Sequence, residues 1–110
     1  MLRVFYVDDE SDLCDLFAEL FTAGDVEVRT FTSPLEALQV MSQDPPDFLF
    51  SDYRMPEMNG IELAKRAPEK VRKFLITGES NITSDFKFEA IIRKPLNSKQ
   101  LKEIFSSANS

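Results

Sequence analysis

The chain has 110 residues, which is the usual size of one domain, and 43% of them are hydrophobic, enough to build a single core. Its 19 acidic and 13 basic residues give a net charge of −6, which argues against broad binding to a nucleic-acid backbone. One cysteine, Cys14, excludes an internal disulfide, and no apolar run is long enough to span a bilayer or to act as a signal peptide. We therefore expect a cytoplasmic protein without membrane contact.

Short runs rich in β-branched and aromatic residues alternate along the chain with segments of helical spacing. The predicted strands cover residues 2–7, 26–31, 47–51, 73–77 and 89–93. The predicted helices cover residues 11–22, 34 up to the Pro45–Pro46 pair, 61–67 and about 98–107. The second of these has the clearest start, with Ser33 as N-cap, Pro34 at the first helical position and Glu36 completing a capping box.

One segment departs from this alternation. Residues 78–89 lie between the last two predicted strands, where a further helix would be expected. Their only apolar anchors for a helix are Ile82 and Phe86, and β-branched residues, serine and asparagine surround them. This composition predicts a loop, or at most about a turn of helix.

Strands that alternate with helices predict an α/β fold, in which a parallel sheet is covered on both faces. In such sheets, ligands bind outside the carboxyl ends of the strands, where the strand order reverses. A strand order of 2-1-3-4-5 would place the first and third strands side by side. Asp8 and Asp9, which follow the first strand, would then share one crevice with Asp52 after the third, while Thr77 and Lys94 end the last two strands.

Three carboxylates in one crevice repel one another unless cations are present. The Lys94 ammonium and a divalent ion would relieve this repulsion. Oxygen ligands without histidine favour a hard ion such as Mg²⁺, which typically uses one or two carboxylates together with phosphate oxygens. One oxygen of Asp52 would then be free to attack phosphorus and form an aspartyl phosphate.

Each of these signals also has an ordinary structural interpretation. The acids of residues 8–27 can form a solvated helix face, and Asp9 can cap a helix. Asp52 can accept a hydrogen bond in a turn, while Thr77 and Lys94 can simply end their strands. Only the joint placement of these residues at the strand ends favours a functional site.

Four short motifs follow the first, third, fourth and fifth strands: VDDE at 7–10, SDYRMPEMNG at 51–60, ITG at 76–78 and RKP at 93–95. Together they resemble the receiver domains of bacterial two-component response regulators, both chemotaxis-type and other single-domain receivers. The resemblance covers nearly the whole chain. It implies a flavodoxin-like, doubly wound five-stranded parallel sheet of order 2-1-3-4-5, with the helix between the last two strands shortened or absent. It also implies one receiver domain over 1–110, with no output domain in this chain.

The resemblance implies a role for each acid of the crevice. Asp52 matches the phosphoacceptor. Asp9 matches the direct ligand of Mg²⁺ or Mn²⁺, and Asp8 the acid that acts on the metal through water. Arg54 would lend its backbone carbonyl to the metal, and its side chain would lie at the mouth of the site.

Further residues match the groups that surround the phosphoryl group in receivers. Thr77 matches the switch hydroxyl, and Lys94 the cation that pairs with the phosphoryl oxygens. Pro95 would follow a cis peptide bond, and Gly78 would leave room for the phosphoryl group.

The chain departs from the family pattern on the side that usually carries output. Receivers commonly place tyrosine or phenylalanine three residues before the lysine-proline pair, and this chain has Ile91 there. The stretch from Thr77 to Lys94 is shorter than usual, and Pro68 cuts the third helix. We therefore expect conventional phosphorylation chemistry with an atypical output face.

The function that this resemblance implies is that of a phosphoacceptor rather than a turnover enzyme. A histidine kinase or phosphotransfer protein would transfer a phosphoryl group to Asp52 and so change contacts with an unknown downstream protein. A homodimer is left open, and no direct contact with nucleic acid is expected. Two alternatives are an interaction module whose output is independent of phosphorylation, and a hydrolase with an aspartyl nucleophile. The sequence argues against the hydrolase, because the position two residues after Asp52, where a general acid would assist hydrolysis, is occupied by Arg54.

Overall fold

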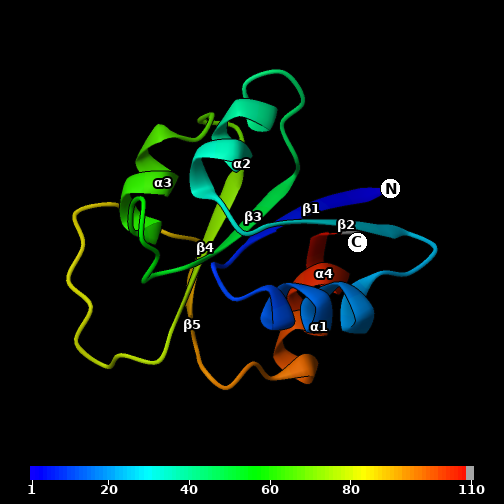
Figure 1. Cartoon of the computed structure of the whole chain (residues 1–110). Coiled ribbons are helices and arrows are strands. Elements are labelled where there is room, and N and C mark those ends of the chain that lie inside the picture. Colours follow the sequence, from blue (N-terminus) through cyan, green and yellow to red (C-terminus); the bar gives the residue numbers. More distant parts are fainter. Residues whose placement is uncertain (109–110) are drawn as a thin grey trace.

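The computed structural model describes residues 1–108. Along the chain, the elements are β1 (Leu2–Val7), α1 (Ser11–Phe21), β2 (Val26–Phe31), α2 (Pro34–Met41), β3 (Phe48–Asp52), α3 (Gly60–Arg66), β4 (Arg72–Thr77), β5 (Ala90–Arg93) and α4 (Ser98–Ala108). The sheet forms the middle layer, with α1 and α4 on one face and α2 and α3 on the other (Figure 1). No helix within this range is long and apolar enough to cross a membrane.

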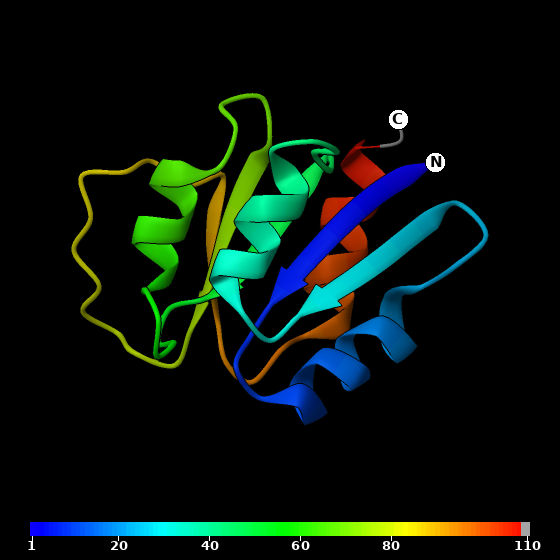
Figure 2. The ribbon, with the colours of Figure 1, turned by 45° about the horizontal axis from the view of Figure 1, so that its top comes forward.

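The five strands form one parallel sheet of order β2-β1-β3-β4-β5. Figure 2 shows β1 and β2 side by side and pointing the same way. The register aligns Val7 with Ser51, and Asp52 with Ile76, so the carboxyl ends of the strands meet at one edge. The predicted fold class and strand order are confirmed, and the strand order reverses between β1 and β3 as expected.

The element bounds differ from the predicted ones by a few residues. α2 ends at Met41, before the Pro45–Pro46 pair, and β3 extends to Asp52, so the acid belongs to the strand itself. The Ser33 hydroxyl accepts the Glu36 N–H at 3.3 Å, as the cap predicts, but its own proton is donated to Glu57 at 2.6 Å.

Phenylalanine dominates the core between the sheet and the α1–α4 layer. Phe50 stacks on Phe74 with ring centroids 4.5 Å apart, and Phe105 of α4 packs edge-on against Phe50 at 5.8 Å. Stacked and edge-to-face rings such as these add to the free energy gained from burying their area. The opposite face of the sheet packs aliphatic side chains of α2 and α3, including Met41 and Leu63.

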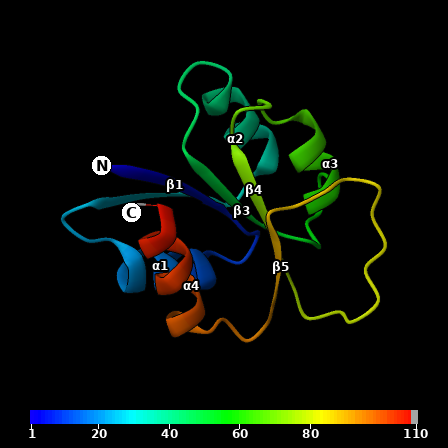
Figure 3. The ribbon, with the colours of Figure 1, turned by 180° about the vertical axis from the view of Figure 1, so that it is seen from behind.

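Residues 78–89, which we call the strap, connect β4 to β5 without a helix. The prediction of a loop in place of a helix is therefore confirmed. The strap makes a wide arc that passes α3 on the far side from α2 (Figure 3). Over residues 81–90, exposed and half-buried positions alternate, as in an extended chain that lies against a surface. Ile91, which follows the strap, is 47% exposed in the middle of β5.

Candidate functional site

The acids predicted to converge lie together at the carboxyl edge of the sheet. Asp8 and Asp9 follow β1, and Asp52 is the last residue of β3. Asp8, Asp9 and Asp52 each place a carboxylate oxygen within 4.8 Å of the others. Asp8 and Asp52 are buried while Asp9 is exposed, so the cluster opens to solvent at Asp9.

Asp52 lies between this cluster and a lysine. The Lys94 ammonium lies 3.2 Å from Asp52 Oδ1, and the Tyr53 N–H donates to the same oxygen at 2.9 Å. Burial and then the charge of Asp8 raise the pKa of Asp52, while Lys94 and the Tyr53 N–H lower it. The net effect is a raised pKa, so the positive charge around Asp52 does not fully compensate its desolvation and the neighbouring acid.

The cluster suits a hard divalent cation. Its donor set consists of carboxylate oxygens, without histidine or thiolate, and this is the set that Mg²⁺ prefers. A cation would also offset the burial and the Asp8 charge that together raise the pKa of Asp52. The residues present therefore fit the expected metal.

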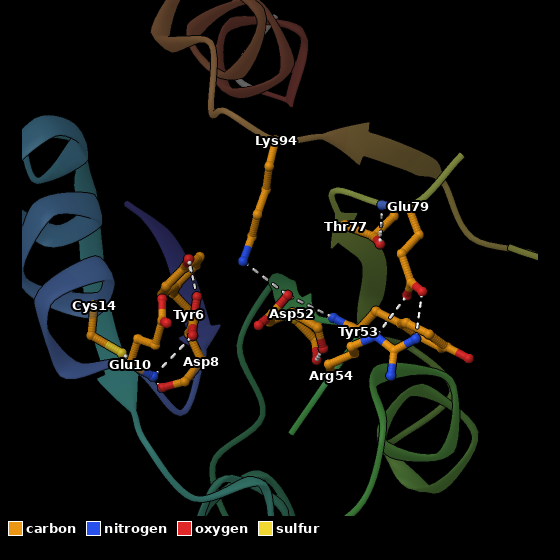
Figure 4. A network of polar contacts seen from close by, with 11 residues as sticks. Tyr6, Asp8, Glu10, Cys14, Asp52, Tyr53, Arg54, Thr77, Glu79 and Lys94 are labelled. Atoms are coloured by element: carbon orange, nitrogen blue, oxygen red, sulfur yellow. Dashed lines mark hydrogen bonds and ion pairs between the residues drawn. The ribbon is translucent and has the colours of Figure 1, made fainter. Parts of the chain in front are cut away.

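Asp8 is held by two donors. Its Oδ2 accepts the Tyr6 hydroxyl at 2.8 Å, and its Oδ1 accepts the Glu10 N–H at 3.0 Å (Figure 4). Burial and the charge of Asp8 raise the pKa of Tyr6, so its hydroxyl keeps its proton. The sequence reasoning missed Tyr6. A polar ring two residues before the acid that follows the strand was the available signal, because i and i+2 share a face in an extended chain.

Thr77 is buried at the end of β4, and its hydroxyl oxygen accepts the Glu79 N–H at 3.0 Å. Beside it, a Cβ added to Gly78 would meet only Lys94 Cβ, at 4.0 Å, so there is space at this position. The Lys94–Pro95 peptide bond is cis, as predicted. Thr77 and Lys94 thus lie at the same edge as Asp52 (Figure 4). Ile91 lies within β5, three residues before Lys94.

Arg54 forms an ion pair that the sequence reasoning also missed. Its exposed guanidinium contacts both carboxylate oxygens of Glu79, with Nε 3.0 Å from Oε2 and Nη2 2.5 Å from Oε1. This pair lowers the pKa of Glu79. Arg54 and Glu79 each stand two residues after a strand-end residue, Asp52 and Thr77. Because β3 and β4 are paired neighbours, this equal offset could have suggested the contact.

The model of the response regulator receiver domain family matches residues 4–106. The chain belongs to this family. Among curated proteins, this receiver domain is 29% identical over 109 residues to the response regulator receiver protein CpdR of Brucella abortus, covering 92% of the chain and 91% of CpdR. It is 35% identical over 92 residues to an uncharacterized response regulatory protein of Vibrio cholerae, covering 78% of the chain but only 35% of that protein. The receiver domain thus spans nearly all of one relative and about a third of the other.

Solved structures agree with this family membership. The response regulator TrrA of Thermotoga maritima, solved in complex with Mg²⁺-BeF, is 27% identical, with a TM-score of 0.85 over 97% of this receiver domain and 98% of TrrA. A CheY-like receiver domain of Methanospirillum hungatei has a TM-score of 0.89 at 22% identity, over 98% of this chain and 93% of its own, and shows the shared fold alone. The predicted family is confirmed, while the roles of single residues stay predictions.

Proposed function

We propose that this receiver domain accepts a phosphoryl group on Asp52 within a two-component phosphorelay. The placement of the Asp52 carboxylate carries this proposal, because it lies between an acidic cluster on one side and the Lys94 ammonium, 3.2 Å away, on the other. The donor would be the phosphohistidine of a histidine kinase or of a phosphotransfer protein. Membership of the receiver family supports this type of partner.

Within this proposal, Asp9, Asp52 and the Arg54 carbonyl hold Mg²⁺ or Mn²⁺, and Asp8 acts on the metal through water. When bound, the metal supplies positive charge beside the phosphoryl oxygens, where negative charge develops during transfer. The clustered oxygen donors support this assignment. The Mg²⁺-BeF complex of TrrA also supports it, since TrrA shares this fold over nearly its whole length.

The transfer step makes one bond and breaks one. An oxygen of Asp52 attacks phosphorus, the bond from phosphorus to the histidine nitrogen breaks, and its electron pair leaves with the imidazole. Lys94 stabilises the charge on the phosphoryl oxygens, and the Thr77 hydroxyl donates to one of them. The domain catalyses its own modification, and water later hydrolyses the acyl phosphate, so it is not a turnover enzyme.

We assign the output to the strap. Four of its side-chain contacts with the β3-α3-β4 unit involve a cation that the unit supplies: Arg54–Glu79, Lys65–Asp85, Arg72–Glu89 and the Lys73 ammonium 5.8 Å from the Phe86 ring centroid. Lys73 is buried, and this burial lowers its pKa, but it donates to the Pro68 carbonyl at 2.7 Å. Charge thus contributes to every one of these side-chain contacts, beside the half-buried apolar side chains of the strap and the backbone bond from the Glu89 N–H to the Lys73 carbonyl.

Glu79 links this strap to the site. Its N–H donates to the Thr77 hydroxyl, and its carboxylate holds Arg54. A phosphoryl group on Asp52 adds about 1.5 to 2 negative charges and strong acceptor oxygens. It would compete with the Glu79 carboxylate for Arg54, and it would accept the proton of the Thr77 hydroxyl, whose oxygen accepts the Glu79 N–H. Phosphorylation would thereby loosen the first residues of the strap and change the surface offered to a downstream protein.

The charge dependence of the strap can be measured by hydrogen exchange. Glu79→Gln should speed amide exchange in residues 80–88 by no more than about fivefold, because an exposed ion pair contributes at most about 1 kcal/mol. Raising the salt concentration from about 0.01 M to about 1 M, which shortens the Debye length from about 30 Å to about 3 Å, should have the same effect in the wild-type protein. Glu103→Gln, at an exposed position of α4, is the control. If neither Glu79→Gln nor the higher salt concentration changes the rate of amide exchange in the strap, its attachment does not depend on charge.

Intact-mass measurement after addition of Mg²⁺ and acetyl phosphate tests phosphorylation. The wild-type protein should gain one phosphoryl group that is stable in acid and labile in base. Asp52→Asn should gain none, because the amide is not a nucleophile towards phosphorus. Asp25→Asn, at an exposed position, is the matched control and should be modified like the wild-type protein. An adduct that persists in Asp52→Asn would place the phosphoryl group elsewhere.

A receiver-like interaction module that works without phosphate remains the second candidate. The exposed Ile91 and the strap in place of a helix favour it, since both alter the face that would change on phosphorylation. Partner binding that is equal for the wild-type protein, with and without acetyl phosphate, and for Asp52→Asn would support this candidate against the first.

A further inference from the structure

Tyr6 is a buried polar side chain in the middle of an apolar strand. Its ring stacks on Phe17 of α1, with centroids 4.2 Å apart and an angle of 14° between the rings. The side chain is fully buried, and its hydroxyl donates to Asp8 Oδ2 at 2.8 Å. Figure 4 shows the ring lying beside α1 with its hydroxyl directed at the Asp8 carboxylate.

The packing of the core gives no reason for the hydroxyl. A phenylalanine would make the same stack with Phe17 and fill nearly the same volume. A phenol in this position is costly unless it is hydrogen-bonded, because its polar atoms are removed from water. The Asp8 carboxylate is the group that satisfies it, so the hydroxyl serves Asp8 rather than the core.

The Tyr6 hydrogen bond holds the second oxygen of the Asp8 carboxylate. Oδ1 already accepts the Glu10 N–H at 3.0 Å, from the start of α1, and Oδ2 accepts Tyr6. A carboxylate has about four lone-pair sites, so these two bonds leave acceptor capacity on Asp8 for ligands. Both bonds involve rigid elements, β1 and the start of α1, and so leave the carboxylate little freedom to rotate.

We propose that Tyr6 is a positioning residue of the metal site, whose hydroxyl holds the Asp8 carboxylate in the orientation used in binding Mg²⁺. This inference rests on the proposed function, in which Asp8, Asp9 and Asp52 surround the metal. Groups that orient metal ligands through a hydrogen bond typically change metal affinity by about 10- to 100-fold when they are removed. Tyr6 acts through Asp8 and does not itself touch the metal.

The test measures binding of Mg²⁺ alone. The rise of the unfolding temperature with Mg²⁺ concentration gives the dissociation constant, because an ion that binds only the folded state stabilises it by mass action. Tyr6→Phe keeps the ring and removes the hydroxyl. Its Mg²⁺ affinity should be about 10- to 100-fold weaker than that of the wild-type protein.

Cys14→Ala separates positioning from general loosening of the site. The Cys14 thiol donates to the backbone carbonyl of Asp8 at 3.3 Å, so this variant disturbs α1 beside Asp8 but keeps both bonds to the carboxylate. Its Mg²⁺ affinity should stay close to that of the wild-type protein. Equal weakening in Cys14→Ala and Tyr6→Phe would overturn the inference.

A spectroscopic signature in the wild-type protein does not depend on how well a variant folds. The hydroxyl proton of Tyr6 is buried in a hydrogen bond, where NMR can detect it, and its signal should shift as Mg²⁺ is added. A resonance that does not move while Mg²⁺ binds, or Tyr6→Phe that binds Mg²⁺ as tightly as the wild-type protein, overturns the role of Tyr6 alone. Absence of Mg²⁺ binding by the wild-type protein would overturn the proposed function as well.

Discussion

Replacing Lys94 by alanine should slow the uptake of a phosphoryl group from acetyl phosphate by about 100- to 1,000-fold. This is the usual loss when one group that stabilises developing charge is removed from a site. Lys94 is suited to this role because its ammonium lies 3.2 Å from Asp52 Oδ1. Rates of adduct formation at fixed Mg²⁺, followed by intact mass, measure the effect. Lys99→Ala, at an exposed position of α4, is the control for loss of a lysine elsewhere and should react at the wild-type rate.

The same variant should change the titration of Asp52. Lys94 lowers the pKa of Asp52, against the larger effects of burial and of the Asp8 charge. Without Lys94 the pKa of Asp52 rises further. Since only the ionised carboxylate attacks phosphorus, uptake should then require a higher pH. NMR titration of the Asp52 carboxyl in metal-free protein detects the shift, and an unchanged titration in Lys94→Ala would show that the pair does not form in solution.

Gly60→Ala should lower the free energy of unfolding by about 1 to 3 kcal/mol, the usual cost of overpacking a filled site. An added Cβ would lie 2.5 Å from the Asp52 carbonyl oxygen and 2.6 Å from Leu75 Cδ1. The backbone oxygen cannot rotate away, so α3 or the end of β3 must move. The Gly60 N–H also donates to the Tyr53 carbonyl at 2.9 Å, next to Asp52. We therefore expect phosphoryl uptake to fall together with stability.

Gly24→Ala is the matched control for this substitution. A Cβ added to Gly24 meets no atom within 4 Å. Its effect should come mainly from the unfolded chain, which loses conformational freedom, and should be neutral to stabilising by about 0.4 to 1 kcal/mol. Urea unfolding of both variants compares them directly. Equal stability of Gly60→Ala and Gly24→Ala would show that α3 can shift away from β3 without cost.

The fold could be predicted because its signals are local. Short apolar runs, and in residues 26–31 an alternation of apolar and polar residues, locate the strands, and the acids or the lysine that follow them mark one edge of the sheet. The absence of a helix in residues 78–89 was also visible, because that segment has few apolar anchors at helical spacing. The family motifs stand at these same strand ends, and for this reason Asp8, Asp9 and Asp52 were expected together.

The contacts that sequence reasoning missed depend on register and on side-chain direction. The Tyr6 bond to Asp8 requires the Asp8 side chain, just after β1, to lie on the same side of the chain as Tyr6, and the Arg54–Glu79 pair requires β3 and β4 to be aligned. A pattern of residue types does not determine either alignment. The alternation of residues 81–90 resembles a strand, yet the strap forms none, because it leaves the sheet at the end of β4 and returns to it only at β5.

The position of Tyr6 beside Asp8 also has an optical consequence. The chain has no tryptophan and only two tyrosines. One of them donates to Asp8, and the other, Tyr53, directly follows Asp52 and donates its N–H to that carboxylate. Ultraviolet emission beyond that of phenylalanine therefore arises entirely from Tyr6, whose ring carries the hydroxyl bound to Asp8, and from Tyr53, whose backbone contacts Asp52. The protein carries its own fluorescent probe at the place where its chemistry is expected, and no label has to be attached to observe it.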